Sequence, residues 1–302
     1  MWPLTSMLFL PAHKLEWVRK VDRYKPDAVI LDLEDAVPPA LKVEARDLAR
    51  EGIALLKGMG IAPFVRINGW GEGGAEDVAR AVVPGIAGIV LPKANDAGQI
   101  RELDLAIAHA EGANGIALGT VDIVPIPETT QGVYHAHALA SASRRCKGLM
   151  GMCGPVNGDV ARAMGFIPTM EGHEQMYLAS KTILDSRAGG APYPMGSIIG
   201  TRLDDLDSVR TLCVRAKQFG FSGAVLIHPS HVAVANEVFA PSADEVEYAV
   251  GLLEAMRAAE KTGSAAVAYR GAMVDYAMEP QARAVIAQAR RRGMAVRAVE
   301  GE

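Results

Sequence analysis

The chain has 302 residues, half of them apolar and 5% aromatic, and its 31 basic and 35 acidic side chains give a formal net charge of −4. This length suits one large α/β barrel or two modest domains, and it allows a large buried core without disulfide bonds. The near balance of charge argues against a nucleic-acid partner and against binding to a membrane surface.

The N-terminal residues and the cysteines indicate where the protein works. Residues 1–14 are apolar but have no basic start and no small-residue cleavage site, so they predict a first strand rather than a signal peptide. No run approaches the roughly 20 apolar residues of a membrane helix. The cysteines, Cys146, Cys153 and Cys213, are few and lack CxxC spacing, which favours a reducing compartment and burial in the core. We therefore expect a cytoplasmic protein without a membrane partner.

Short apolar, β-branched runs alternate with longer segments of helical length and spacing. The runs predict eight strands, at Met7–Pro11, Ala28–Leu33, Phe64–Asn68, Gly88–Pro92, Ile123–Pro127, Gly148–Met152, Ser197–Gly200 and Ala224–His228. The segments between them predict helices such as Ala40–Gly58, Asp96–Glu111, Gly172–Arg187 and Leu206–Gly220. Eight such units favour an α/β fold closed as a (β/α)8 TIM barrel over residues 1–240. The alternative, an open doubly wound sheet, lacks the GxGxxG of its commonest dinucleotide-binding form.

The remaining residues, 241–302, exceed what one barrel helix requires. Two segments have helical spacing, Asp244–Lys261 and Gln281–Arg292, and Thr262–Pro280 between them shows little regular pattern. We expect a C-terminal helical extension that serves either as a lid or as an arm reaching a neighbouring subunit.

Polar residues gather where the predicted strands end, which is where barrel enzymes carry their catalytic groups. These positions are Asp32-Leu33-Glu34-Asp35, Arg66-Ile67-Asn68, Pro92-Lys93, Pro127-Glu128, Asn157-Gly158-Asp159 and His228-Pro229. Several have structural alternatives: Glu34 as an ion-pair partner of Arg66, Asp35 as a turn residue, and Asp159 as a helix N-cap. Glu128 is harder to explain structurally, because it follows an apolar run in which an unpaired carboxylate would be costly to bury.

Two carboxylates and one arginine at these ends suit a particular chemistry. Two oxygen ligands plus waters are the usual protein share of a Mg²⁺ site, and the open positions let a 2-oxo acid chelate the metal. An arginine binds a carboxylate or stabilises a developing oxyanion. The set predicts aldol- or Claisen-type cleavage of a carbon–carbon bond.

An ordered series of short motifs spans nearly the whole chain. The motifs are SMLFLP (Ser6–Pro11), AVILDLEDAV (Ala28–Val37), FVRIN (Phe64–Asn68), IVLPK (Ile89–Lys93), PET (Pro127–Thr129) with Gly132, Asp159 with Gly165, IHP (Ile227–Pro229), FAPS (Phe239–Ser242) and GAMVD (Gly271–Asp275). In this order they resemble the citrate lyase β-subunit-like (CitE-like) branch of the HpcH/HpaI aldolase superfamily, which includes malyl-CoA and citramalyl-CoA lyases.

The resemblance implies roles for individual residues. It implies that Glu128 and Asp159 hold Mg²⁺ in a (β/α)8 barrel and that Arg66 binds the oxo-acid end of the substrate. It also implies that Asp275 enters the site of a neighbouring subunit as an acid/base group, in a homotrimer or a hexamer. The site residues predicted on this basis are Arg66, Asp275 and Glu34 for catalysis and Arg66, Asn68, Lys14 and Pro229 for substrate binding.

The chain departs from the family pattern at several positions, namely Thr5, Ala12, Asn95, Gly158 and His231. Those beside the first and eighth strands fall in loops that, by the resemblance, grip coenzyme A. Three reactions are therefore open. They are cleavage of a 3-hydroxy-carboxyacyl-CoA (citramalyl-, malyl- or citryl-type) to acetyl-CoA and a 2-oxo acid, hydrolysis of such a thioester by a malyl-CoA-type thioesterase, and class II aldol cleavage of free 2-oxo-acid aldols without CoA. A non-catalytic subunit is least consistent with the intact metal pair.

Overall fold

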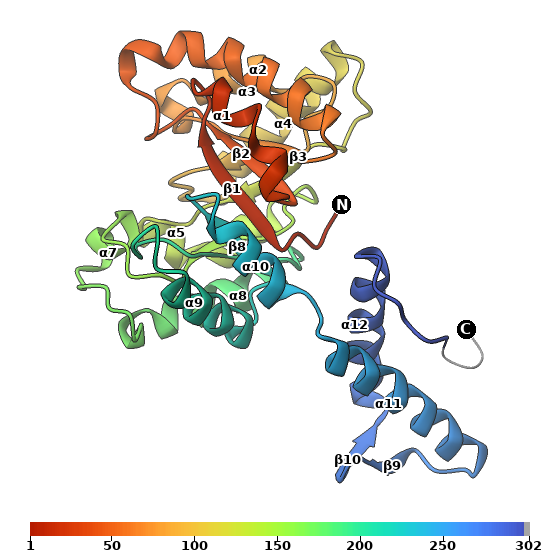
Figure 1. Ribbon diagram of the computed structural model, residues 1–302. Helices are drawn as coiled ribbons and strands as arrows, with labels where there is room; N and C mark the ends of the chain where they lie inside the picture. Colours follow the sequence, from red (N-terminus) through yellow and green to blue (C-terminus); the bar gives the residue numbers. More distant parts are fainter. Residues whose placement is uncertain (299–302) are drawn as a thin grey trace. The chain divides into compact units, whose positions relative to one another are not determined.

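The computed structural model describes residues 1–298, and the internal contacts divide the chain into two units, Met1–Phe239 and Ala240–Glu302. No helix of the described residues is long and apolar enough to cross a membrane. Figure 1 labels most of the elements of both units. Each unit has its own hydrophobic cluster.

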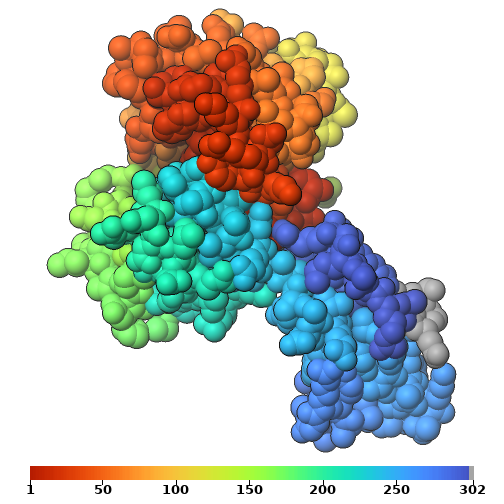
Figure 2. Space-filling model, in the orientation of Figure 1, coloured from red at the N-terminus to blue at the C-terminus, as the bar shows by residue number. Residues whose placement is uncertain are grey.

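Eight parallel strands form the first unit. They are β1 (Ser6–Pro11), β2 (Ala28–Asp32), β3 (Ala62–Arg66), β4 (Gly88–Leu91), β5 (Asp122–Pro125), β6 (Met150–Met152), β7 (Met195–Ser197) and β8 (Gly223–Leu226). Their order, β5-β4-β3-β2-β1-β8-β7-β6, puts the first and last strands side by side. Figure 2 shows the red N-terminal segment lying against the cyan segment that follows β8, as this pairing requires.

The junction between β5 and β6 differs from the other seven. A single parallel bridge joins Ile123 to Cys146, through hydrogen bonds from the Ile123 N–H to the Arg145 carbonyl and from the Lys147 N–H to the Ile123 carbonyl. Cys146 lies four residues before β6 begins, so the bridge ties the strands near their amino ends. We call this junction the β5–β6 seam. It leaves the barrel nearly closed.

One buried cluster fills the interior of the barrel. Each strand contributes to it, with the members Met7, Ile30, Phe64, Val90, Val124, Met150, Met195 and Val225. Inward-facing residues from every strand, packed in layers, are how a (β/α)8 barrel fills its centre. The cluster also crosses the seam, since Val124 and Met150 belong to it. The predicted (β/α)8 fold is confirmed.

Helices surround the strands in the first unit. They are α1 (Leu15–Val18), α2 (Lys42–Gly58), α3 (Gly74–Ala81), α4 (Ala97–Ala113), α5 (Thr130–Tyr134), α6 (Ala136–Ser141), α7 (Asp159–Met164), α8 (Met176–Ala188), α9 (Leu206–Phe219) and α10 (His231–Phe239). Short 3-10 turns complete the connections, at Val21–Tyr24, Pro39–Leu41, Trp70–Glu72 and His173–Gln175. On α2 the buried residues recur every three or four positions, and Gly52 lets the helix approach Leu31, because a Cβ there would lie 2.9 Å from the Leu31 side chain.

The predicted seventh strand is wrong in position. Ser197–Gly200 was expected, whereas β7 is Met195–Ser197. The apolar run at Ile198–Ile199 suggested a strand, but the chain turns there: Gly200 has φ +104°, and a Cβ on it would lie 2.5 Å from the backbone of Pro155 and Val156. The sixth strand is also shorter than expected, since Gly148 and Leu149 precede β6.

The second unit contains two helices, α11 (Ala243–Lys261) and α12 (Glu279–Arg291), with a short 3-10 turn, Tyr276–Met278, before α12. The Thr262–Pro280 segment, expected to lack regular structure, contains an antiparallel hairpin of β9 (Ala266–Tyr269) and β10 (Ala272–Asp275). Its two-residue turn, Arg270-Gly271, has positive φ at both positions, 45° and 82°, which suits a hairpin connection. Val274 and Val267 from the hairpin pack with apolar residues of both helices.

Candidate active site

The ends of β2 and β3 hold a half-buried arginine, Arg66. Asp32 and Arg66 are paired in register, and the guanidinium donates two hydrogen bonds to the Asp32 carboxylate, at 2.7 and 2.6 Å. Arg66 Nη1 lies 3.0 Å from Glu34 Oε2, and the guanidinium carbon lies 4.7 Å from the centre of the Phe9 ring. Although burial alone lowers the pKa of Arg66, hydrogen bonding and attraction to Asp32 raise it, so the arginine stays charged. The expected Glu34–Arg66 ion pair is present.

Lys93, after β4, completes this charge network. Its ammonium lies 2.6 Å from Glu34 Oε1 and 3.8 Å from Asp35, which is largely exposed. Its backbone has φ +48°, an uncommon conformation for a residue with a side chain, and its N–H donates to Glu128 Oε1 at 3.0 Å. Burial raises the pKa of Glu34 above its usual value, although Arg66 and Lys93 lower it. Lys93 thus links the carboxylate at the end of β2 to the one that follows β5.

Glu128 is a carboxylate with too few donors. Burial raises its pKa to about 7. The Lys93 N–H and Arg66 oppose the shift, and repulsion from Glu34 and Asp159 adds to it. Within the described residues the only hydrogen bond to the Glu128 carboxylate is the one from Lys93. A half-buried carboxylate with so few donors is stabilised by a cation.

Asp159 is the first residue of α7 and lies close enough to Glu128 and Lys93 to affect the pKa of both. The alternative that Asp159 is an N-cap is wrong, because Gly158 occupies the N-cap position. The Asp159 side chain instead contacts Arg162 one turn later. Asp159 and Glu128 line one cavity of about 170 Å³ at the β5–β6 seam. The structure therefore brings the two predicted metal ligands together.

This donor set fits Mg²⁺. Carboxylate oxygens are the hard ligands that Mg²⁺ prefers, and two of them with several waters are its usual share from a protein. The raised pKa of Glu128 fits the same conclusion, because its carboxylate repels Asp159 and Glu34 and gains from a nearby cation. Among the described residues no three histidine, cysteine, aspartate or glutamate side chains converge on one point as a full metal cage. The ligand roles of Glu128 and Asp159 remain predictions.

Asn68, two residues after Arg66, is buried. Its side-chain nitrogen and its backbone N–H both donate to Asp77, each at 2.7 Å, and its Oδ1 accepts a hydrogen bond from Lys42 at 2.7 Å. Lys42 also donates to the carbonyls of Leu33 and Glu34. The protein already engages the Asn68 amide on both sides, so these contacts hold the ends of β2 and β3 together.

The two loops predicted to bind the rest of the substrate belong to neighbouring strands, β1 and β8. Lys14 follows β1 and is half-buried, and the Nδ1 of His13 beside it has no hydrogen-bond partner among residues 1–298. Pro229 follows β8 between His228, whose Nδ1 lies 2.6 Å from Ser230 Oγ, and the buried His231. Their part in binding remains a prediction.

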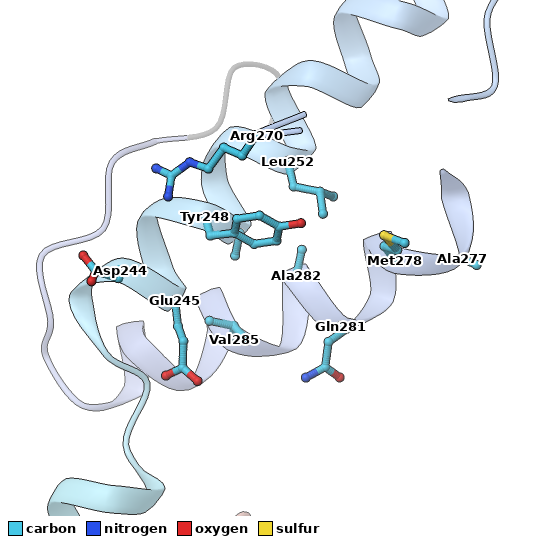
Figure 3. Close-up of a pocket in the computed structure, with 11 residues that line it drawn as sticks. Asp244, Glu245, Tyr248, Leu252, Arg270, Ala277, Met278, Gln281, Ala282 and Val285 are labelled. Carbon is cyan, nitrogen blue, oxygen red and sulfur yellow. The ribbon is translucent and has the colours of Figure 1, made fainter. Parts of the chain in front are cut away.

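Asp275 lies in the second unit, at the end of β10. Its side chain is exposed and accepts a hydrogen bond from the Ala277 N–H at 2.9 Å. Exposed apolar side chains flank it, those of Met273, Tyr276 and Met278. A hollow of about 620 Å³ lies between α11 and α12 and is mostly apolar; Figure 3 shows Tyr248 and Leu252 facing Ala282 there. It contains none of the predicted site residues, so size alone does not identify the active site.

Asp32 and Lys93 belong to the charge network around Arg66. Neither was among the predicted site residues, although both stand at the ends of predicted strands. Asp32 lies two residues before Glu34 and opposite Arg66, so the parallel register could have identified it as the partner of the arginine. Nothing in the sequence indicates the positive φ of Lys93. The three cysteines are buried as expected, and burial raises the pKa of each thiol to about 12.

A nearly closed (β/α)8 barrel with an ion-paired arginine and a carboxylate pair at the carboxyl ends of its strands defines an α/β-barrel enzyme. The model of the HpcH/HpaI aldolase/citrate lyase family matches residues 5–229, so the chain belongs to that family, and the prediction of an enzyme of the carbon–carbon lyase class is confirmed.

Individual relatives agree with this assignment. The citrate lyase subunit beta-like protein of Deinococcus radiodurans is 30% identical, over 94% of this chain and 96% of its own. A (3S)-malyl-CoA thioesterase of Cereibacter sphaeroides is also 30% identical, over 95% of each chain. The CitE protein of Mycobacterium tuberculosis, solved in complex with magnesium, acetoacetate and coenzyme A, is 25% identical, with a TM-score of 0.71 over 95% of this chain and 98% of its own.

Proposed function

We propose that this protein is a Mg²⁺-dependent lyase that cleaves a 3-hydroxy-carboxyacyl-CoA, of the citramalyl, malyl or citryl type, to acetyl-CoA and a 2-oxo acid. The observation that carries the proposal is the meeting of Glu128 and Asp159 in one cavity, with Glu128 electrostatically coupled to Arg66. The binding of magnesium and coenzyme A by the Mycobacterium tuberculosis relative supports it. The buried, free thiols support the predicted cytoplasmic location.

In the proposed reaction, Glu128 and Asp159 hold the Mg²⁺ ion, which when bound supplies Lewis-acid polarisation of the 2-oxo-acid oxygens. Arg66, fixed by its two bonds to Asp32, stabilises negative charge that develops there, a contribution of roughly 3–4 kcal/mol for a well-placed donor. Glu34, whose pKa is raised, accepts the hydroxyl proton as the carbon–carbon bond breaks. The electron pair of that bond passes to the thioester, giving its enolate.

Asp275 then protonates the enolate carbon. In our proposal it comes from a neighbouring subunit of a homotrimer or hexamer, because it is exposed on its own unit and surrounded by exposed apolar side chains. A mixing experiment tests this step. Inactive Arg66→Ala and Asp275→Ala proteins, dissociated and reassembled together, should regain activity because some sites receive both intact residues. Failure to regain activity, with mixed assembly shown by mass spectrometry, would refute the shared site.

The reaction itself is tested with purified protein, Mg²⁺ and each of the three thioesters, with acetyl-CoA and the 2-oxo acid quantified. We expect cleavage of at least one thioester and loss of cleavage with excess chelator. The absence of cleavage, and of condensation in the reverse direction, would refute the lyase.

A thioesterase is the second candidate, favoured by the (3S)-malyl-CoA thioesterase relative. It would release free CoA and the hydroxy diacid without acetyl-CoA, so the same assay separates the two reactions. A class II aldolase acting on free 2-oxo-acid aldols is the third, and it would cleave substrates that lack CoA.

A further inference from the structure

The cavity at the β5–β6 seam has two parts. Its inner wall comes from residues at the barrel mouth, Ile126, Met150 and Met152, and its outer wall from helix residues, Val133 of α5 and Leu178 and Thr182 of α8. The carboxyl ends of β5 and β6 do not pair, because the single bridge lies near their amino ends. The cavity therefore passes between the two strands, beside both predicted metal ligands.

Apart from the metal pair and the two hydroxyl residues Thr182 and Ser197, the lining is apolar. Glu128 and Asp159 are its only ionisable residues, and the cavity has no arginine, lysine or histidine within the described chain. The Thr182 hydroxyl already donates to the Leu178 carbonyl at 2.8 Å. The nearby cations are already engaged: Arg162, which is largely exposed, by Asp159, Arg66 by Asp32 and Lys93 by Glu34. A second carboxylate placed here would thus lack a free cationic partner, which is costly.

We infer that this cavity receives the substituent on the oxo carbon of the substrate's 2-oxo-acid part and selects an alkyl group there. The inference rests on the proposed function, because it requires a 2-oxo acid bound at Glu128 and Asp159. One water molecule needs about 10–15 Å³ of cavity volume, so the cavity of about 170 Å³ accommodates a methyl or ethyl group easily. The structure then favours a citramalyl-type thioester, which releases pyruvate, or its one-carbon-longer homologue, over the malyl and citryl types.

Binding of free 2-oxo acids tests the inference without turnover. Dissociation constants are measured by calorimetry on the full-length protein with saturating Mg²⁺, for glyoxylate, pyruvate, 2-oxobutyrate and fresh oxaloacetate. Each added carbon should tighten binding about fourfold, from glyoxylate to 2-oxobutyrate. Oxaloacetate should bind on the order of 100-fold more weakly than 2-oxobutyrate, because its second carboxylate lacks a cation.

A pair of variants on α8 sharpens the test. Leu178→Arg brings a cation into the cavity and should improve oxaloacetate binding relative to 2-oxobutyrate by at least about tenfold. Leu184→Arg, at an exposed position of the same helix outside the cavity, should leave the ratio unchanged. If Leu178→Arg does not fold, the wild-type series still decides the question.

The outcomes separate the inference from the proposed function. Oxaloacetate binding as tightly as 2-oxobutyrate, no gain along the alkyl series, or no binding of any 2-oxo acid would overturn the inference. If the alkyl 2-oxo acids bind in the expected order but no thioester is cleaved, the pocket stands and the lyase falls.

Discussion

Two glutamates flank the same strand, β5, the buried Glu111 and the half-buried Glu128, and their environments are opposite. Glu111 lies at the amino end, where Arg145 donates two hydrogen bonds to it and the N–H groups of residues 119–121 donate three more. Glu128 follows the carboxyl end and receives one hydrogen bond within the described residues. Although burial alone raises both pKa values, that of Glu111 is lowered to about 2 by its donors, and that of Glu128 is raised to about 7.

The two ends of the barrel strands therefore have different roles. At the amino ends of the strands a buried charge is fully satisfied, which stabilises the fold. At the carboxyl ends the Glu128 carboxylate has few hydrogen-bond donors, which is the condition for binding a cation or moving a proton. Glu111 and Glu128 therefore predict opposite results when each is changed to glutamine.

The largest expected effect is that of Glu128→Gln. We expect Mg²⁺-dependent cleavage to fall on the order of 1000-fold, because the variant loses an anionic ligand beside the reacting atoms. The free energy of unfolding should stay equal or rise slightly, since a neutral amide removes the repulsion from Glu34 and Asp159. Initial rates, Mg²⁺ calorimetry and urea unfolding measure these. Unchanged Mg²⁺ affinity would contradict the ligand role.

Glu111→Gln should give the reverse result. It leaves Arg145, whose side chain is 7% exposed, with Asp104 as its one carboxylate partner among the described residues, so the free energy of unfolding should fall by about 3 kcal/mol. The catalytic rate of the folded fraction should be nearly unchanged. Urea unfolding with the rate assayed below the transition tests both. A stable but inactive variant would contradict the structural role of Glu111, because it would place this residue in the catalytic machinery.

The pH dependence of stability sharpens the same contrast. The folded-state pKa of Glu111, about 2, lies below its ordinary 4.5, so its contribution is present above about pH 4.5 and is lost as the pH falls toward 2. Between pH 5 and pH 3 the wild type should lose about 2 kcal/mol more than Glu111→Gln. Urea unfolding at each pH measures the difference. Parallel curves for the two proteins would show that Glu111 is not the carboxylate responsible.

Much of this arrangement follows from the sequence, for identifiable reasons. The eight strands are visible because buried parallel strands are short apolar runs, and Glu128 stands out because it follows one directly. The hairpin of residues 266–275 escaped prediction because its short strands contain three alanines and its turn starts at Arg270, which is unusual at positive φ. The end of β7 was misplaced because contacts with residues 155–156, far away in sequence, decide where the chain turns.

That turn leads to the smallest expected effect. Gly200 lies against Pro155 and Val156, in the loop just before Asp159, and a Cβ on it would come within 2.5 Å of their backbone. Gly200→Ala should therefore displace the loop and weaken Mg²⁺ binding about tenfold, as changes to the residues that support a metal ligand do.

Gly190→Ala is the matched control, because Gly190 also has a positive φ, +87°, but its Cβ would meet nothing within 4 Å. Calorimetry on both variants separates displacement of the loop from backbone strain. If both variants bind Mg²⁺ equally weakly, backbone strain alone is responsible. If only Gly200→Ala binds Mg²⁺ more weakly, backbone packing at the carboxyl ends of the strands positions Asp159, whereas hydrogen bonds position Glu111 at the amino ends.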